Sequence, residues 1–214
     1  MGQAALEYVT ADTIIGVGTG TTVNRFIDAL ACMRGQIRGA VSSSLASTRH
    51  LLDVGIQVFD LSDVTELSVY IDGADEIDPL GYMVKGGGAA LTREKIVAAQ
   101  SRRFVCIADE SKLVQTLGIC PLPIEIIPMA TQRIVRQFAD MGARAVLRLK
   151  NGVPLVTDNG LNLLDVSGLR ITDPPSFETC VSQWPGVVTV GVFALQKANV
   201  CLLGTATGIK TLQF

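Results

Sequence analysis

Short apolar runs separated by polar, glycine-rich segments make up the first half of the chain. We predict strands at residues 13–17, 37–41, 56–59, 67–71 and 104–108. Apolar residues spaced three and four positions apart predict helices at residues 23–33, 45–54 and 88–100. Strands that are apolar throughout are typical of a parallel sheet with both faces covered. The pattern therefore predicts a Rossmann-like α/β fold, a mostly parallel sheet with helices on both faces.

The pattern changes after Cys120. An extended segment bounded by prolines is followed by an amphipathic helix, a strand, a hairpin with an Asp-Asn-Gly turn, a helix that starts after two prolines, and a further strand. This β-α-β-β-α-β order predicts a smaller ferredoxin-like α+β domain. We assign residues 1–121 and 192–214, with a final strand at 199–209, to the α/β domain. Residues 122–191 form the α+β domain, which we expect to take part in assembly.

Composition and charge narrow the class of protein. The 214 residues carry a net charge of −2 and no polybasic run, which argues against nucleic acid or an anionic membrane surface as a partner. No apolar run reaches the roughly 18 residues that a membrane helix needs. The first residues lack the basic and apolar regions of a signal peptide. Five scattered cysteines without a CxxC pair indicate a reduced, cytoplasmic protein.

The single histidine, His50, limits the kinds of active site that the chain can build. It lies in a polar, helix-like stretch, where a surface or helix-end position is expected. A Ser-His-Asp triad and a metal site with several histidines are therefore nearly excluded by counting. Proton transfer must be carried out by carboxylates, lysines or water.

A glycine- and threonine-rich segment, Gly16–Thr22, joins the first predicted strand to the first predicted helix. Such a turn presents free backbone N–H groups at the positive end of a helix dipole, which suits a phosphate. The segment is neither a Walker A loop, because no GK[ST] follows, nor a complete GxGxxG motif. The alternative is a tight strand-to-helix turn that needs glycine for its backbone alone.

Four carboxylates fall within seven positions, at Asp72, Asp75, Glu76 and Asp78. Asp72 follows a predicted strand, as do the Gly-Thr turn, the serines at 42–44 and residues 109–112, so one pocket beyond the strand ends can collect these segments. For the serines, N-capping of the next helix is favoured over a place in the site. The carboxylates could instead hold Mg²⁺ or Ca²⁺. However, DGADEID does not fit a calcium loop, and a nearby lysine favours a site without metal. We expect Glu76 and Asp78 to be turn and surface charges.

Glu94 is the candidate general base. At about 100° per residue, a helix over 88–100 places Glu94 in the same arc as Ala90, Leu91 and Val97, on the inward face. Burial of a carboxylate in such a place raises its pKa, as a base working near neutral pH requires. The alternative is a solvated helix start in which Glu94 pairs with a neighbouring cation.

Lys85 precedes three glycines, Gly86–Gly88, at the start of the same predicted helix. The glycines permit close backbone approach and form a second segment rich in N–H donors. The lysine could supply positive charge to a developing oxyanion. Asp72 and Asp75 could bind sugar hydroxyls or transfer protons.

Five motifs, taken in order, carry a resemblance to a known family: GVGTGTT, SSS, DGADEID, KGGGAALTREK and ADESK. With PLPIEIIPMA, VTDNGLNLLD and PGVVTVGVFA they extend over essentially the whole chain, which resembles ribose-5-phosphate isomerase of the A type. The resemblance implies an aldose–ketose isomerase that interconverts ribose 5-phosphate and ribulose 5-phosphate without metal or cofactor, in the non-oxidative pentose phosphate pathway. It also implies a Rossmann-like domain with a smaller α+β domain, assembled as a homodimer or a tetramer.

The resemblance also assigns roles to residues. Glu94 would move a proton between C2 and C1 through an enediolate that Lys85 stabilises, while Asp72, with Asp75 nearby, would assist ring opening and hydroxyl transfers. The implied substrate contacts are Thr19, Gly20, Thr21, Thr22, Asp72, Gly73, Ala74, Asp75, Lys85, Gly86, Gly87, Gly88 and Lys112. Members of the family carry an N-terminal lysine that reaches the substrate phosphate, whereas no lysine precedes Lys85 here.

Two other functions fit parts of the sequence. A sugar-phosphate sensor, built on an α/β domain like those of transcription regulators, would lack a base on the reacting face and would carry a DNA-binding segment. Glu94 and the lack of a basic helix-turn-helix motif in this sequence favour the enzyme. A carboxylate metal enzyme acting on phosphate esters would lose its activity in a chelator.

Overall fold

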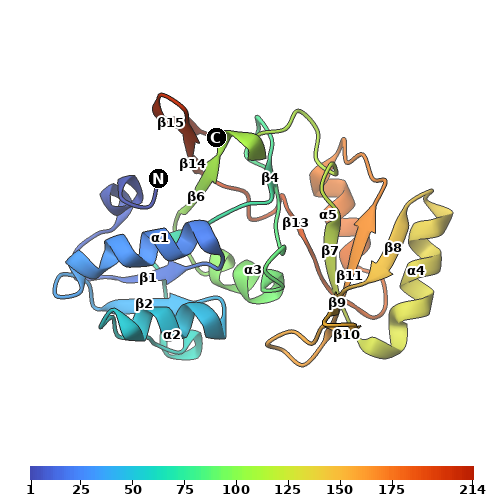
Figure 1. Ribbon diagram of the computed structural model, residues 1–214, viewed down its shortest axis with the longest axis horizontal. Helices are drawn as coiled ribbons and strands as arrows, with labels where there is room; N and C mark the ends of the chain where they lie inside the picture. The colour runs from blue at the N-terminus through green and yellow to red at the C-terminus, as the bar shows by residue number, and fades with distance from the viewer. The chain divides into compact units, whose positions relative to one another are not determined.

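The computed structural model describes residues 1–214, and Figure 1 shows its helices and strands. Contacts within the chain divide it into two units. The first unit comprises residues 1–74, 93–112 and 196–214, and the second comprises residues 75–92 and 113–195. None of the helices combines the length and the apolar character that crossing a membrane requires.

A six-stranded sheet in the order β15-β14-β6-β3-β1-β2 forms the centre of the first unit. Its strands are β1 (Ile14–Val17), β2 (Gly39–Ser42), β3 (Tyr70–Asp72), β6 (Phe104–Asp109), β14 (Val200–Thr205) and β15 (Gly208–Gln213). Neighbouring strands are parallel except β14 and β15, which form an antiparallel hairpin. The mostly parallel α/β sheet predicted from the apolar runs is confirmed.

Helices cover both faces of this sheet, as predicted. They are α1 (Thr21–Leu30), α2 (Leu45–Asp53) and α3 (Leu91–Ala99). On one face, Ile15 of β1 packs in a buried core with Phe26 of α1. Gly16, the next residue of β1, faces the other way, where an added Cβ would lie 2.8 Å from Val97 of α3. Alternation along the strand therefore gives each face its own helix.

Two strand predictions in the first unit are wrong. Residues 56–59 meet β2 only at a single bridge between Ala40 and Val58, because hydrogen bonds on either side of Val58 all go to Ala40. The stretch at 199–209 is not one strand but most of the β14–β15 hairpin, because the chain reverses between Thr205 and Gly208.

The short 3-10 helices are η1 (Ala4–Tyr8), η2 (Ala31–Met33), η3 (Leu61–Asp63), η4 (Glu110–Lys112) and η5 (Pro128–Ala130).

The second unit contains an antiparallel sheet in the order β12-β7-β11-β8. Its elements, in chain order, are β7 (Leu122–Ile126), α4 (Thr131–Asp140), β8 (Arg144–Leu147), β11 (Asn162–Ser167), α5 (Pro174–Ser182) and β12 (Val187–Val190). This β-α-β-β-α-β order with β7 and β11 in the middle is the ferredoxin-like arrangement that the pattern predicted. The core includes a tilted ring pair, Phe138 and Trp184, with centroids 4.9 Å apart.

Two smaller sheets complete the second unit. One is a hairpin of β9 (Leu149–Lys150) and β10 (Val153–Pro154), and the other has the order β13-β5-β4, from Val192–Phe193, Met83–Val84 and Glu76–Ile77. The hairpin was not predicted, although Asn151 and Gly152 both have positive φ, as a two-residue Asn-Gly turn requires.

The units differ from the predicted domains at the small sheet. Residues 75–92, 113–121 and 192–195 belong to the second unit rather than the first. The reason is their pairing, since β5 pairs with β13 and the backbone N–H of Lys85 donates to the Gly191 carbonyl at 2.8 Å.

Candidate active site

The Gly-Thr turn after β1 makes an unusually close approach to the end of β3. The backbone N–H of Gly18 donates to the Ile71 carbonyl at 2.9 Å, and an added Cβ on Gly18 would lie 1.9 Å from Cγ of Asp72. Only glycine fits at this point. Helix α1 starts directly after Gly20, without a side-chain cap, so its first N–H groups are able to donate hydrogen bonds to an anionic ligand.

Asp72 ends β3 and is fully buried. Its Oδ1 accepts hydrogen bonds from the backbone N–H groups of Thr19 (3.1 Å) and Gly73 (2.7 Å), and its Oδ2 accepts one from the Tyr70 hydroxyl. The Thr19 hydroxyl is hydrogen-bonded in turn to the Ser43 hydroxyl at 2.9 Å. A buried carboxylate needs such donors, and together they hold the Asp72 side chain in one orientation.

The Tyr70 hydroxyl donates to Asp72 and lies within electrostatic range of Glu94. Burial raises the pKa of the Tyr70 hydroxyl well above its usual value, and the charges of Asp72 and Glu94 raise this pKa further. The hydroxyl therefore remains a donor over the physiological pH range. Because both carboxylates act on the same hydroxyl, Asp72 and Glu94 lie around Tyr70 in the first unit. Glu94 is 2% exposed, so its predicted inward position on α3 is confirmed, whereas Arg93 and Lys95 are half-buried.

Lys112 lies in η4, beyond the carboxyl end of β6. In the same turn, Asp109 accepts hydrogen bonds from the hydroxyl and the backbone N–H of Ser111. The Ser111 hydroxyl, then its backbone N–H and the charge of Lys112, lower the pKa of Asp109. The turn therefore keeps an ionised carboxylate beside the lysine at neutral pH.

In the second unit, the Lys85–Gly88 loop follows β5. Lys85 is 3% exposed, and its Nζ lies 5.4 Å from the centroid of the Phe193 ring, a cation–π contact. Gly86 has a φ of 108°, and an added Cβ would come within 3.0 Å of Leu91 and 3.1 Å of Pro123. The loop therefore requires glycine at this position for its backbone conformation and for space.

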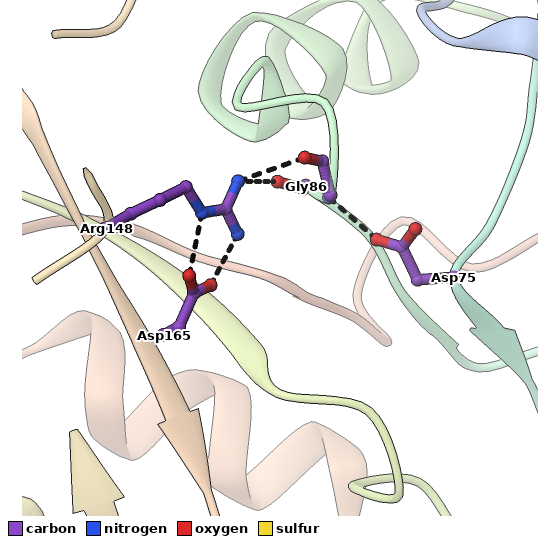
Figure 2. Close-up of polar contacts among 5 residues, drawn as sticks. Asp75, Gly86, Arg148 and Asp165 are labelled. Atoms are coloured by element: carbon purple, nitrogen blue, oxygen red, sulfur yellow. Dashed lines mark hydrogen bonds and ion pairs between the residues drawn. The ribbon is translucent and has the colours of Figure 1, made fainter. Parts of the chain in front are cut away.

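Both sides of the glycine loop are hydrogen-bonded within the second unit (Figure 2). The Gly87 N–H donates to Asp75 Oδ2 at 2.8 Å. On the other side, Arg148 Nη1 donates to the Gly86 and Gly87 carbonyls, each at 3.0 Å. Arg148 also donates to both carboxylate oxygens of Asp165 on β11. Sequence reasoning missed Arg148 and Asp165, because nothing in their local sequence indicates that Arg148 reaches a loop sixty-two positions away or that Asp165 binds Arg148.

The expectation for Glu76 and Asp78 is wrong, because both are buried. Glu76 accepts hydrogen bonds from the backbone N–H groups of Gly118 and Cys120, and Asp78 accepts from those of Leu80 and Tyr82. These carboxylates replace backbone partners in turns that have no regular structure. They therefore hold loops in place.

Another buried carboxylate, Glu125 on β7, was missed. It is 1% exposed and accepts hydrogen bonds from the hydroxyls of Thr92 and Thr157 and from the Asn159 side chain. Thr92 is in the first turn of α3, two residues before Glu94. Glu125 therefore anchors the start of the helix that carries the candidate base.

Each unit brings together some of the predicted site residues. In the first unit, Thr19, Asp72 and Gly73 are hydrogen-bonded to one another, and Glu94 lies beside Tyr70. In the second unit, Asp75 is hydrogen-bonded to the Lys85–Gly88 loop. Gly20, Thr21 and Thr22 lie at the start of α1 and Lys112 lies in η4, and the structure does not hydrogen-bond them or Ala74 to these groups. Ser44 caps α2 by accepting from the Ser47 N–H at 3.1 Å, as the favoured reading of the serines predicted.

These features define a class of protein, an α/β enzyme with buried carboxylates at the ends of parallel strands and a lysine beside a glycine loop. Residues 39–208 match the family described as Ribose 5-phosphate isomerase A (phosphoriboisomerase A). The chain is 72% identical to Ribose-5-phosphate isomerase A of Albidiferax ferrireducens, over all of this chain and 92% of that protein. It therefore belongs to the ribose 5-phosphate isomerase A family, a family of isomerases, as the motifs indicated.

Solved structures agree with this assignment. The crystal structure of ribose 5 phosphate isomerase A from Neisseria gonorrhoeae is similar with a TM-score of 0.95 and 42% identity, over 99% of this chain and 93% of that one. A D-ribose-5-phosphate isomerase in complex with phospho-erythronic acid is similar with a TM-score of 0.94 and 36% identity, over 100% of this chain and 96% of that one.

Proposed function

We propose that this protein interconverts ribose 5-phosphate and ribulose 5-phosphate through an enediolate, with Glu94 as the general base. The observation that carries the proposal is the position of Glu94, a carboxylate 2% exposed beside the Tyr70–Asp72 pair in a member of this family. The reaction belongs to the non-oxidative pentose phosphate pathway of the cytoplasm.

The chemistry needs a base that reaches one face of the open-chain sugar. Glu94 removes the proton from C2 of the aldose, and the electron pair of that bond moves to make the C1–C2 double bond while O1 takes the negative charge. A proton then moves from O2 to O1, which leaves the negative charge on O2, and the carbonyl forms at C2 as Glu94 returns its proton to C1. A base held away from bulk water keeps that proton for the second half of the reaction.

Asp72 would assist the steps at oxygen. Ribose 5-phosphate is mostly a closed ring, so its O1 hydroxyl must lose a proton and its ring oxygen must gain one before isomerisation. A carboxylate held in one orientation by Thr19, Gly73 and Tyr70 is suited to that transfer. Asp75, three positions after Asp72, would bind a substrate hydroxyl.

Lys85 would stabilise the enediolate, because a buried cation interacts more strongly with a developing negative charge than an exposed one. The phospho-erythronic acid bound to the solved relative supports this view. That compound carries a carboxylate and a phosphate, and its carboxylate has the planar, delocalised charge of an enediolate.

The phosphate would bind at the start of α1. The turn Thr19–Thr22 offers backbone N–H groups and threonine hydroxyls at the positive end of the helix dipole. Lys112 would add a positive charge. The proposed contacts of the substrate also include Gly73, Ala74 and Gly86–Gly88.

The direct test is an isomerisation assay on ribose 5-phosphate with the wild type, Glu94→Gln and Glu7→Gln, a control at an exposed glutamate. We expect Glu94→Gln to lower kcat at least about a hundredfold while phospho-erythronic acid still binds. Turnover in EDTA should equal turnover without it. Near-normal kcat in Glu94→Gln would refute the assignment of the base, and a wild type that binds the sugar phosphate without converting it would support a sensor instead.

We also propose that the protein forms a homodimer in which the second unit takes part. Exposed apolar side chains on and beside the β9–β10 hairpin, at Leu149, Val153 and Val156, support this proposal. Light scattering coupled to size exclusion would measure the mass in solution, and a monomeric mass at micromolar concentration would contradict it.

A further inference from the structure

Little within the glycine loop fixes its shape beyond a backbone hydrogen bond from the Ala89 N–H to the Gly86 carbonyl at 2.9 Å. Gly86, Gly87 and Gly88 lack side chains, and glycine loses more conformational freedom on folding than any other residue. N–H groups stabilise a developing charge only when they are fixed before the charge appears. Some other part of the chain must therefore hold this loop.

Arg148, in the segment between β8 and β9, holds this loop by hydrogen bonds (Figure 2). Its Nη1 donates to the carbonyls of Gly86 and Gly87, each at 3.0 Å, so one nitrogen holds two consecutive peptide groups. Its Nε donates to Asp165 Oδ2 at 2.8 Å, and its Nη2 donates to Oδ1 of the same carboxylate. The side chains of Arg148 and Asp165 are 16% and 22% exposed, so solvent competes little for the pair.

Because each peptide group is planar, these contacts also fix the direction of the N–H groups on the opposite face of the loop. In a trans peptide group the C=O and the N–H point in opposite directions within one plane. Because the Gly87 carbonyl points at Arg148, the Gly88 N–H points away from it. The Gly87 N–H, opposite the Gly86 carbonyl, donates to Asp75. Arg148 thus orients the amides on the face that also carries Asp75.

We propose that Arg148 is a positioning residue for the Lys85–Gly88 loop, and that Asp165 orients Arg148. The role in catalysis rests on the proposed function, in which this loop supports the enediolate. Arg148 donates to the Gly86 and Gly87 carbonyls and to Asp165, so its proposed effect on turnover passes through the loop.

Only an arginine can make this set of contacts. The guanidinium presents donors on two edges, one matched to the Asp165 carboxylate and one to the two carbonyls. A lysine keeps the charge but offers one nitrogen, which cannot reach both sites. Arg148→Lys therefore removes the orientation without removing the charge.

The test compares Arg148→Lys with Arg144→Lys, a matched change at an exposed arginine of β8. In an assay on ribose 5-phosphate, we expect Arg148→Lys to lower kcat at least about tenfold, with a much smaller change in KM, because a misplaced group costs turnover steeply. Binding of phospho-erythronic acid should weaken in step with kcat/KM. Hydrogen exchange at Gly87 and Gly88, followed by mass spectrometry, should be faster in Arg148→Lys than in the wild type. Asp165→Asn should show the same effects to a lesser degree.

The outcomes distinguish a failure of the proposed function from a failure of the proposed role of Arg148. A wild type that does not convert ribose 5-phosphate would overturn the proposed function, and faster loop exchange in Arg148→Lys would then still support the positioning role. An active wild type together with wild-type kcat and loop exchange in Arg148→Lys would overturn the role of Arg148 alone. Slower turnover with unchanged loop exchange would overturn it too, because the effect would not pass through the loop.

Discussion

Replacing Gly18 with alanine should displace Asp72, although the change adds only one methyl group. The added Cβ would lie 1.9 Å from Asp72 Cγ and 2.0 Å from Oδ1, whereas real Cβ atoms essentially never come within 3.0 Å of a heavy atom outside their own and adjacent residues. Asp72 is fully buried, and the N–H groups of Thr19 and Gly73 hold its Oδ1, so it can yield only by disturbing those contacts. The carboxylate must therefore move by roughly 1 Å, the scale at which misplaced groups lose about a hundredfold in rate.

That displacement also costs stability. The contacts most affected are the hydrogen bonds from the N–H groups of Thr19 and Gly73 to Oδ1. Hydrogen bonds to a charged group contribute about 1.5 to 3 kcal/mol each, and part of each should survive as the turn adjusts. We expect the free energy of unfolding of Gly18→Ala to fall by about 3 kcal/mol.

Urea unfolding at neutral pH and the ribose 5-phosphate assay measure the two effects. Gly35→Ala is the matched control, since an added Cβ there meets nothing within 4 Å and its φ is not in the positive range. It should unfold close to the wild type and retain full turnover. A Gly18→Ala protein with wild-type stability and wild-type kcat would refute the reasoning, because it would mean that Asp72 tolerates displacement.

Two further predictions concern the buried polar groups. Of the three tyrosines, Tyr70 should release its proton last in an alkaline titration followed by tyrosinate absorbance. Because the folded-state pKa of Tyr70 is raised, the protonated hydroxyl stabilises the fold below the usual tyrosine pKa, and this contribution is lost as the pH rises toward the raised value. Tyr70→Phe should therefore lose less stability than the wild type between neutral and alkaline pH. An equal loss in the two proteins would contradict the predicted direction of the pH dependence. Glu125→Gln places an amide where the Thr92 and Thr157 hydroxyls donate to a carboxylate, so its urea midpoint should fall by an amount equivalent to about 2 kcal/mol. The control Glu66→Gln, at an exposed glutamate, should change the midpoint little. Equal midpoints in the two variants would count against the Glu125 network.

The sequence predicted the elements whose pattern is local. Uniformly apolar strands indicated the parallel sheet, and the β-α-β-β-α-β order indicated the ferredoxin-like unit, both of which the structure contains. Predictions failed where local pattern and long-range pairing disagree. Residues 56–59 are apolar enough for a strand but reach the sheet at one bridge only. Residues 75–92 look continuous with the first unit, but they contain β5, which pairs with β13.

For the candidate site, helical spacing predicted the burial of Glu94, and the order of the motifs predicted the family. The same reasoning took Glu76 and Asp78 for surface charges, because acidic residues near glycine and proline usually are. It gave no place to Tyr70, Arg148 or Glu125, because each acts on a residue far away along the chain: Glu94, Gly86 and Thr157, respectively.

The amino-acid sequence by itself determined which residues are candidates for the chemistry and which faces are buried, because periodicity and residue type are properties of neighbours along the chain. Only the tertiary structure decided which side chains hold those residues in place. Arg148 reaches Gly86 across sixty-two positions, and Gly18 must be glycine because Asp72, fifty-four positions later, occupies the space of its Cβ. Contacts of this kind arise from the packing of strands and loops, and no local pattern records them.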